Sequence, residues 1–290
     1  MSEVVLSIIL TGKKSEESVD ALSSFNQQTI NTEIIRVPEE ENVCVARNFG
    51  LKKAKGKYVC FLCEGDDFEP EFLERLLYSI EPRIGGKPVP DALGKGVKKD
   101  VDLGCVGYTI DGEESPETNE RVLSEEDMLC RLFYTEHDQG MVWNKVFRRD
   151  LIAGFHLAFR EDLTCEYDRL FLTEYLLHCD YIRMIPDRLC HHTTEEEAWD
   201  PSGLEAYDAM HKALKHYEDA KWLCGQNMAL QELSLFATIL EDKDAPRGAY
   251  KKSPLRKYAR QAKKLQFVPY DDEDAWLYKK LIFYGFTGKY

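Results

Sequence analysis

The chain has 290 residues, of which 43% are hydrophobic and 31% are charged, and its formal net charge at pH 7 is -14. This composition is that of an ordinary globular protein, with enough apolar residues to bury a full core. An acidic chain repels a phosphate backbone, so nucleic acid is excluded as the main partner.

The nine cysteines are scattered along the chain. Cys60 and Cys63 lie closest, but in an extended strand a separation of three residues points their side chains to opposite faces, which argues against a shared zinc ion. Reduced thiols in a cytoplasmic protein are the simpler expectation.

The sequence shows no secretory leader and no apolar run near the roughly 18 to 20 residues of a membrane span, which also favours a cytoplasmic protein.

Strand and helix patterns alternate along the first part of the chain. Residues 4–10 (VVLSIIL) are apolar on both faces, as in a strand that helices cover on both sides of a sheet. Ser15 is a helix N-cap candidate, and Lys55-Gly56 is a stop signal for a second helix. In chain order the patterns predict a strand at 4–10, a helix at 15–25, a strand at 33–37, a helix at 46–54, a strand at 58–62, a helix at 70–80, a strand at 101–110 and a helix at 124–134.

This alternation predicts an α/β fold with a mostly parallel sheet flanked by helices. From residue 203 onward the β signal fades and helical periodicity dominates. The chain is therefore expected to form an α/β domain over residues 1–200 and an α-helical C-terminal extension over residues 201–290.

Several unusual short motifs occur in a fixed order within residues 4–193. They are Ala46-Arg47-Asn48-x-Gly50 followed by KAKGKY, an acidic cluster followed by EPEFLERL, and Trp143-Asn144-Lys145. In this order they resemble bacterial family 2 glycosyltransferases of the GT-A fold, and several motifs together are more specific than any one of them. The resemblance implies a Rossmann-like GT-A domain.

The resemblance also implies an activity. Such enzymes carry out an inverting transfer of a sugar from a nucleotide-diphosphate sugar, here expected to be a UDP-sugar, to a glycan or lipid-linked acceptor in bacterial surface polysaccharide synthesis. The donor binds at the carboxyl ends of the strands. Mn²⁺ or Mg²⁺ bridges the two phosphates, and a carboxylate takes the proton of the acceptor hydroxyl.

The metal motif of the family, Asp-x-Asp-Asp after an apolar strand, is altered in this chain. An alignment without gaps puts Cys63 and Gly65 on the metal positions and abolishes the site. A shift of one residue puts Glu64, Asp66 and Asp67 there, which a β-bulge would allow, and we favour this interpretation. The other interpretation is a solvated cluster at a helix start.

A histidine is the fourth expected metal ligand. His191 and His192 lie where some relatives place a histidine near the diphosphate or the metal. We assign His191 to the metal and expect one of the two to be a plain solvent-facing residue.

The donor-binding residues implied by the resemblance are Thr11, Glu39, Arg47, Asp66 and Trp143. The acidic turn that contacts the nucleobase and ribose in relatives is missing, and Glu39 is the candidate that replaces it. Trp143 fits an aromatic wall for the sugar, although a large aromatic side chain belongs to the core more often than to a ligand site.

The expected catalytic base lies in the segment CEYDRLF. The resemblance aligns Asp168 and Phe171 with an Asp-x-x-Phe motif and makes Asp168 the base, with Glu166 in reserve. The alternative for Asp168 is a carboxylate that is satisfied by a helix dipole.

A basic segment follows the predicted domain. Residues 245–264 carry eight lysines and arginines and no acid. Such a segment suits the anionic inner face of a membrane, which would make the protein peripheral there. The alternative is a solvated helix docked on the acidic body of the protein.

For the chain as a whole, the alternative to an enzyme is a non-catalytic GT-A-like subunit that binds a partner transferase or a glycan.

Overall fold

The computed structural model describes residues 4–12, 31–37, 42–63, 66–81, 100–133, 139–193 and 202–241, together with residues 276, 279, 280 and 283. The helix expected at 15–25, the candidate residues Glu39 and Glu64 and the basic segment 245–264 lie outside the described residues.

The strands and helices expected in the described part of the chain are present, with boundaries shifted by a few residues. The strands are β1 (Leu6–Thr11), β2 (Thr32–Arg36), β3 (Tyr58–Cys63), β4 (Asp67–Phe68), β5 (Leu103–Ile110), β6 (Glu113–Glu114), β7 (Arg121–Leu123), β8 (Lys145–Arg148) and β9 (Ile182–His192). The helices are α2 (Val43–Lys53), α3 (Phe72–Ile80), α4 (Glu125–Arg131), α5 (Arg149–Gly154), α6 (Tyr167–Leu176), α7 (Ser202–Ala213) and α8 (Glu218–Glu241).

The sheet is mixed, with one reversed strand near its centre. Its order is β2-β1-β3-β8-β5-β9-β4. β1 runs parallel to β2 and β3, and β5 runs parallel to β9, whereas β8 is antiparallel to both of its neighbours, β3 and β5. The strands β1, β3, β5 and β9 therefore all end at one edge of the sheet, where β8 begins.

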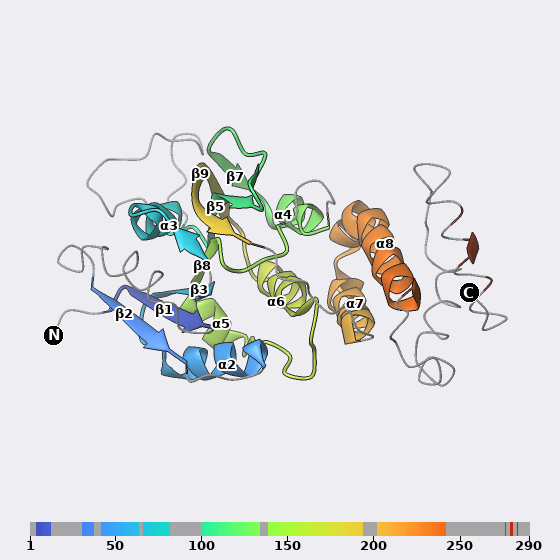
Figure 1. Ribbon diagram of the computed structural model, residues 1–290, viewed down its shortest axis with the longest axis horizontal. Coiled ribbons are helices and arrows are strands. Elements are labelled where there is room, and N and C mark those ends of the chain that lie inside the picture. The colour runs from blue at the N-terminus through green and yellow to red at the C-terminus, as the bar shows by residue number, and fades with distance from the viewer. Residues whose placement is uncertain are drawn as a thin grey trace.

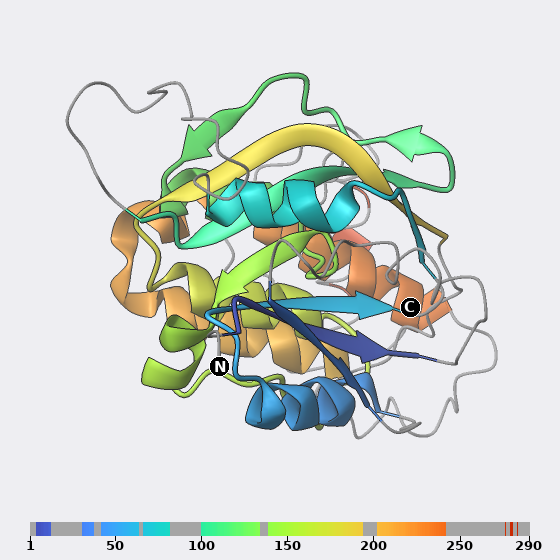
Figure 2. The ribbon, with the colours of Figure 1, turned by 90° about the vertical axis from the view of Figure 1, so that its left-hand side faces the viewer.

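Each face of the sheet has its own core, which explains the strands that are apolar on both faces. Ile9 and Phe61 point into a core that includes residues of α2, α6 and α7, while the intervening Ile8 and Cys60 point into a core with α3. The side view shows α2 and α3 on opposite sides of the strands (Figure 2). The side-chain period of two in a strand supplies both cores from one apolar run.

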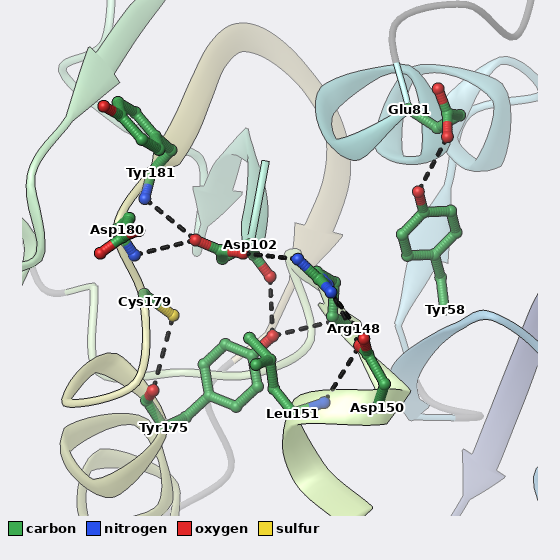
Figure 3. A network of polar contacts seen from close by, with 10 residues as sticks. All are labelled: Tyr58, Glu81, Asp102, Arg148, Asp150, Leu151, Tyr175, Cys179, Asp180 and Tyr181. Atoms are coloured by element: carbon green, nitrogen blue, oxygen red, sulfur yellow. Dashed lines mark hydrogen bonds and ion pairs between the residues drawn. The ribbon is translucent and has the colours of Figure 1, made fainter. Parts of the chain in front are cut away.

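A hydrogen-bond network ties the strands together at the edge opposite to the carboxyl ends. The carboxylate of Asp102 accepts bonds from Arg148 (2.9 Å) and from the backbone N–H groups of Asp180 (2.8 Å) and Tyr181 (3.1 Å). The Tyr175 hydroxyl donates to the Asp102 carbonyl at 2.7 Å, and Figure 3 shows the arrangement. Both carboxylate oxygens are satisfied, so this network is a structural anchor.

The helices after residue 200 lie at one end of the molecule (Figure 1). The first of them, α7, packs against α6 and buries Tyr207 and Met210 in the same core as Phe171. Gly203 permits this approach, since a Cβ atom there would lie 2.7 Å from the sulfur of Cys165. Residues on the two sides of position 200 therefore share one core. In the described part of the chain, no helix combines the length and apolar character of a membrane span.

Candidate active site

The register between β4 and β9 brings a carboxylate and an imidazole together at the carboxyl edge of the sheet. Asp67 pairs with His191 in the antiparallel ladder, so the preceding Asp66 lies opposite the following His192. The Nδ1 atom of His192 is hydrogen-bonded to Oδ1 of Asp66. Asp66 is buried, and its Oδ2 atom has no hydrogen-bond partner among the described residues. A buried carboxylate oxygen without a partner is costly, so this position suits a ligand.

An aromatic stack supports the imidazole. The ring of His192 stacks on Trp143 with 5.0 Å between ring centroids, and Tyr108 packs edge-on against the same indole at 5.4 Å. Trp143 is only 5% exposed. The structure therefore places Trp143 behind the histidine, and not at the surface where a sugar would stack.

The expected base, Asp168, forms an ion pair with Arg47 of α2, in which Arg47 is buried and the Asp168 side chain is 18% exposed. The other carboxylate oxygen of Asp168 accepts a hydrogen bond of 3.3 Å from the backbone N–H of Val142. The Arg47 guanidinium also lies over the rings of Phe159 (5.1 Å) and Tyr167 (5.5 Å), and its Nε has no partner among the described residues.

The electrostatics of this pair suit proton transfer. Burial raises the pKa of Asp168 above its ordinary value, and Arg47 and the Val142 N–H offset only part of this rise. Burial acts against the charge on Arg47, but Asp168 together with Tyr167 and Cys44 outweighs this effect, and the pKa of Arg47 is raised. A buried carboxylate that binds a proton more readily than an exposed one is a suitable general base.

The rest of the Ala46-Arg47-Asn48-x-Gly50 motif positions Arg47. The Asn48 amide donates to the Phe159 carbonyl at 2.8 Å and accepts from the Phe159 N–H at 2.9 Å. Gly50 lets α2 lie against β1, because a Cβ atom at this position would lie 2.4 Å from Ile9 Cγ2. Asn48 and Gly50 thus fix the position of α2, and with it the position of Arg47.

The reserve base, Glu166, has a different environment. It adopts a left-handed backbone conformation with φ 58° just before α6, and its carboxylate forms an ion pair with Arg169 on the same helix. The Glu166 side chain is 5% exposed. This ion pair is local, and it stabilises the first turn of α6, which contains Asp168.

The other predicted site residues lie around this edge. Thr11 is buried at the end of β1, and its hydroxyl donates to the Leu62 carbonyl at 3.4 Å. Asp67 is exposed, and Nε2 of His191 lies 3.5 Å from Glu69. The described residues contain no group of three potential metal ligands, and Glu64 is not among them. The structure thus brings Asp66 together with His192, and not with Asp67 or His191.

Comparisons with known proteins show which proteins the chain is similar to. Residues 7–83 match the sequence profile of Glycosyl transferase family 2. The resemblance to family 2 glycosyltransferases is confirmed. A protein described as glycosyltransferase EpsH of Bacillus subtilis (strain 168) is 22% identical over 172 residues, which are 57% of this chain and 45% of that protein. The chain therefore matches less than half of the length of this relative.

The fold of the chain is also similar to solved structures. TarS of S. aureus (residues 1–349) in complex with UDP-GlcNAc is 15% identical, with a TM-score of 0.62 over 99% of this chain and 93% of that one. TarS in complex with UDP is 13% identical, with a TM-score of 0.60 over the same shares of the two chains. The predicted GT-A class of fold is confirmed.

The unpartnered oxygen of Asp66 predicts an unusual response to mutation. Asp66→Asn removes a buried charge whose Oδ2 atom has no hydrogen-bond partner among the described residues, and the Asn Oδ1 atom can still bond to His192. We therefore expect the free energy of unfolding at pH 8 without divalent ions to stay equal or rise by about 1 kcal/mol. The matched control is Asp102→Asn, which breaks a fully paired carboxylate and should cost about 3 kcal/mol. Denaturant titration measures both. An Asp66→Asn protein as destabilised as Asp102→Asn would show that Asp66 is a structural residue.

Proposed function

We propose that the chain is an inverting glycosyltransferase that moves a sugar from a UDP-sugar to a glycan or lipid-linked acceptor in the synthesis of a bacterial surface polysaccharide. The observation that carries this proposal is the buried Asp66 carboxylate, with one unpartnered oxygen, beside His192 at the carboxyl edge of the sheet. This edge is where ligands of open α/β sheets bind. The similar TarS structures, which are complexes with UDP-GlcNAc and UDP, support a uridine nucleotide.

Asp66 and His192 are the described residues that would hold a divalent cation. A carboxylate with an imidazole suits Mn²⁺ better than Mg²⁺, which prefers oxygen ligands alone. When bound, the ion would neutralise the charge that develops on the diphosphate leaving group. Glu64, Asp67 and His191 stay predicted ligands.

Asp168 is the proposed base. Its carboxylate would accept the proton of the acceptor hydroxyl while that oxygen forms a bond to the anomeric carbon, and the bond from this carbon to the diphosphate breaks on the opposite face. Arg47 favours the ionised carboxylate in a buried place, since its charge opposes the effect of burial on the pKa of Asp168. Removal of Arg47 would leave a buried carboxylate that stays protonated to higher pH.

Calorimetric titration with UDP-GlcNAc, with and without Mn²⁺, tests the donor site. We expect the wild-type protein to bind the donor, and to bind it more tightly with Mn²⁺. Asp66→Asn should lose the Mn²⁺ dependence, whereas Glu69→Gln, a change at a carboxylate at least half exposed, should keep it. Absence of donor binding under both conditions would favour the alternative, a non-catalytic GT-A-like subunit.

The pH dependence of transfer tests the base. Asp168 must be ionised to accept a proton, so kcat/KM should fall as the pH falls through the raised pKa of Asp168, above the ordinary value of 3.8. Arg47→Met should move this acid limb to higher pH by about one unit or more, because it removes the charge that lowers this pKa.

Asp168→Asn provides the second arm of this test. It should reduce transfer by about 10²- to 10⁴-fold while donor binding persists, since a base acts on the acceptor. Normal turnover of Asp168→Asn, or an acid limb that Arg47→Met leaves in place, would exclude Asp168 as the base.

We also propose that the basic segment 245–264 brings the protein to an anionic membrane, where a lipid-linked acceptor would lie. Each lysine or arginine near such a surface contributes about 1 kcal/mol. Co-sedimentation with anionic vesicles should therefore be salt-sensitive and should disappear when the chain is truncated after Asp244. Equal pelleting of the truncated and full-length proteins would favour the alternative of a segment that is docked on the acidic body.

A further inference from the structure

Lys145 is a cation in the interior of the protein. It begins β8 and is 0% exposed. Its Nζ atom donates to the Met141 carbonyl at 2.7 Å, to Asn144 Oδ1 at 2.8 Å and to Gln139 Oε1 at 3.4 Å. All three acceptors belong to residues 139–144, which we call the pre-β8 segment. The ammonium group therefore acts as a bridge that folds this segment around itself.

The charge of Lys145 is expensive in this place. A buried ammonium group loses several kcal/mol of hydration, and close carboxylates repay this cost best. Three neutral oxygens of the pre-β8 segment accept hydrogen bonds from this group, and Gln139 in turn donates through Nε2 to the buried carboxylate of Glu117 at 3.4 Å. The hydrogen bonds from the ammonium group to the pre-β8 segment offset part of the lost hydration and hold this segment in one conformation.

The pre-β8 segment contacts both halves of the candidate site. The Val142 N–H donates to Asp168 at 3.3 Å, and the next residue, Trp143, stacks on His192, which is itself bonded to Asp66. Two consecutive residues thus contact the proposed base and the proposed metal ligand. A shift of this short piece of backbone would move both contacts together.

We propose that Lys145 is a positioning residue, which holds the pre-β8 segment so that Asp168 and His192 keep their relative places. The proposal rests on the proposed function only in what it says about transfer. Its structural part, that the ammonium group of Lys145 maintains the Trp143–His192 stack, is testable without any donor or acceptor.

The imidazole NMR signals report on this stack. The His192 ring lies on the Trp143 indole, and ring current from the indole displaces the His192 signals upfield; their loss in His192→Gln assigns them. His178 lies on Phe155 with 3.5 Å between ring centroids, so its displaced signals are an internal control in the same spectrum. The two stacks involve no common residue.

Three variants carry the test. Lys145→Met keeps the length of the side chain and removes its charge and donors. The double variant Lys145→Met/Glu117→Gln also removes the buried carboxylate that Gln139 contacts and that lies 3.7 Å from Arg131, so it offers a second background if Lys145→Met alone does not fold. The matched control is Lys57→Met, which removes a lysine whose side chain is 56% exposed and whose Nζ lies 3.0 Å from Glu81.

We expect the His192 signals to lose most of their upfield displacement in Lys145→Met and in the double variant, while the His178 signals stay in place. Lys57→Met should leave both sets unchanged. If the proposed function holds, kcat of the variants without Lys145 should fall about 10- to 100-fold, a size known for small displacements of reacting groups. Unchanged His192 signals in a folded variant without Lys145 would overturn the proposal, whether or not the wild-type protein transfers a sugar.

Discussion

β8 runs opposite to β3 and β5, its neighbours in the middle of the sheet. It therefore begins at the edge where the other central strands end, and the chain must cross the site before it enters β8. The backbone just before β8 therefore lies at the site. Val142 and Trp143, separated from β8 only by Asn144, contact Asp168 and His192. The rest of the candidate site depends on this one reversal.

The two edges of the sheet differ in how their buried charges are satisfied. At the amino ends of β3 and β5, Asp102 has partners for both carboxylate oxygens, and Arg148 and Tyr175 complete the network. At the carboxyl ends, Asp66 Oδ2 and Arg47 Nε lack hydrogen-bond partners among the described residues. Glu117 Oε2 and Arg183 Nη2 also lack hydrogen bonds among these residues, but these two side chains are in ion pairs with Arg131 and Glu120. Proteins accept such incomplete satisfaction mostly where function requires it, because each buried unpartnered group costs about 1 to 3 kcal/mol.

The short motifs contain candidate site residues and residues that hold the backbone around them. In the first motif, Arg47 contacts Asp168. Asn48 binds the backbone of Phe159, and Gly50 allows β1 to lie close to α2. In the second, Trp143 supports His192, and Asn144 holds β5 through a bond of 2.9 Å to the Val106 carbonyl. A sequence motif therefore indicates where a site lies, but it does not show which of its residues contacts the ligand.

The sequence by itself determined the class of fold. Apolar runs with periods of two and 3.6 residues identify β1, β3, α2 and α3, because burial on a sheet or helix face depends on side-chain spacing alone. The order of short motifs also predicted the resemblance to family 2 glycosyltransferases, and it named Asp66, Arg47 and Asp168 as candidate site residues. These properties are local in the chain and are readable without coordinates.

Only the tertiary structure decided which residues meet. His192 was chosen over His191 by the register of β4 against β9, and a shift of one residue would reverse the choice. Arg47 and Asp168 are 121 residues apart in the chain, so no local pattern reveals their ion pair. The buried places of Trp143 and Lys145 follow from the direction of β8, which its four residues do not encode. Contacts between side chains that are distant in the sequence depend on strand order and register, and the packing of the whole core determines both.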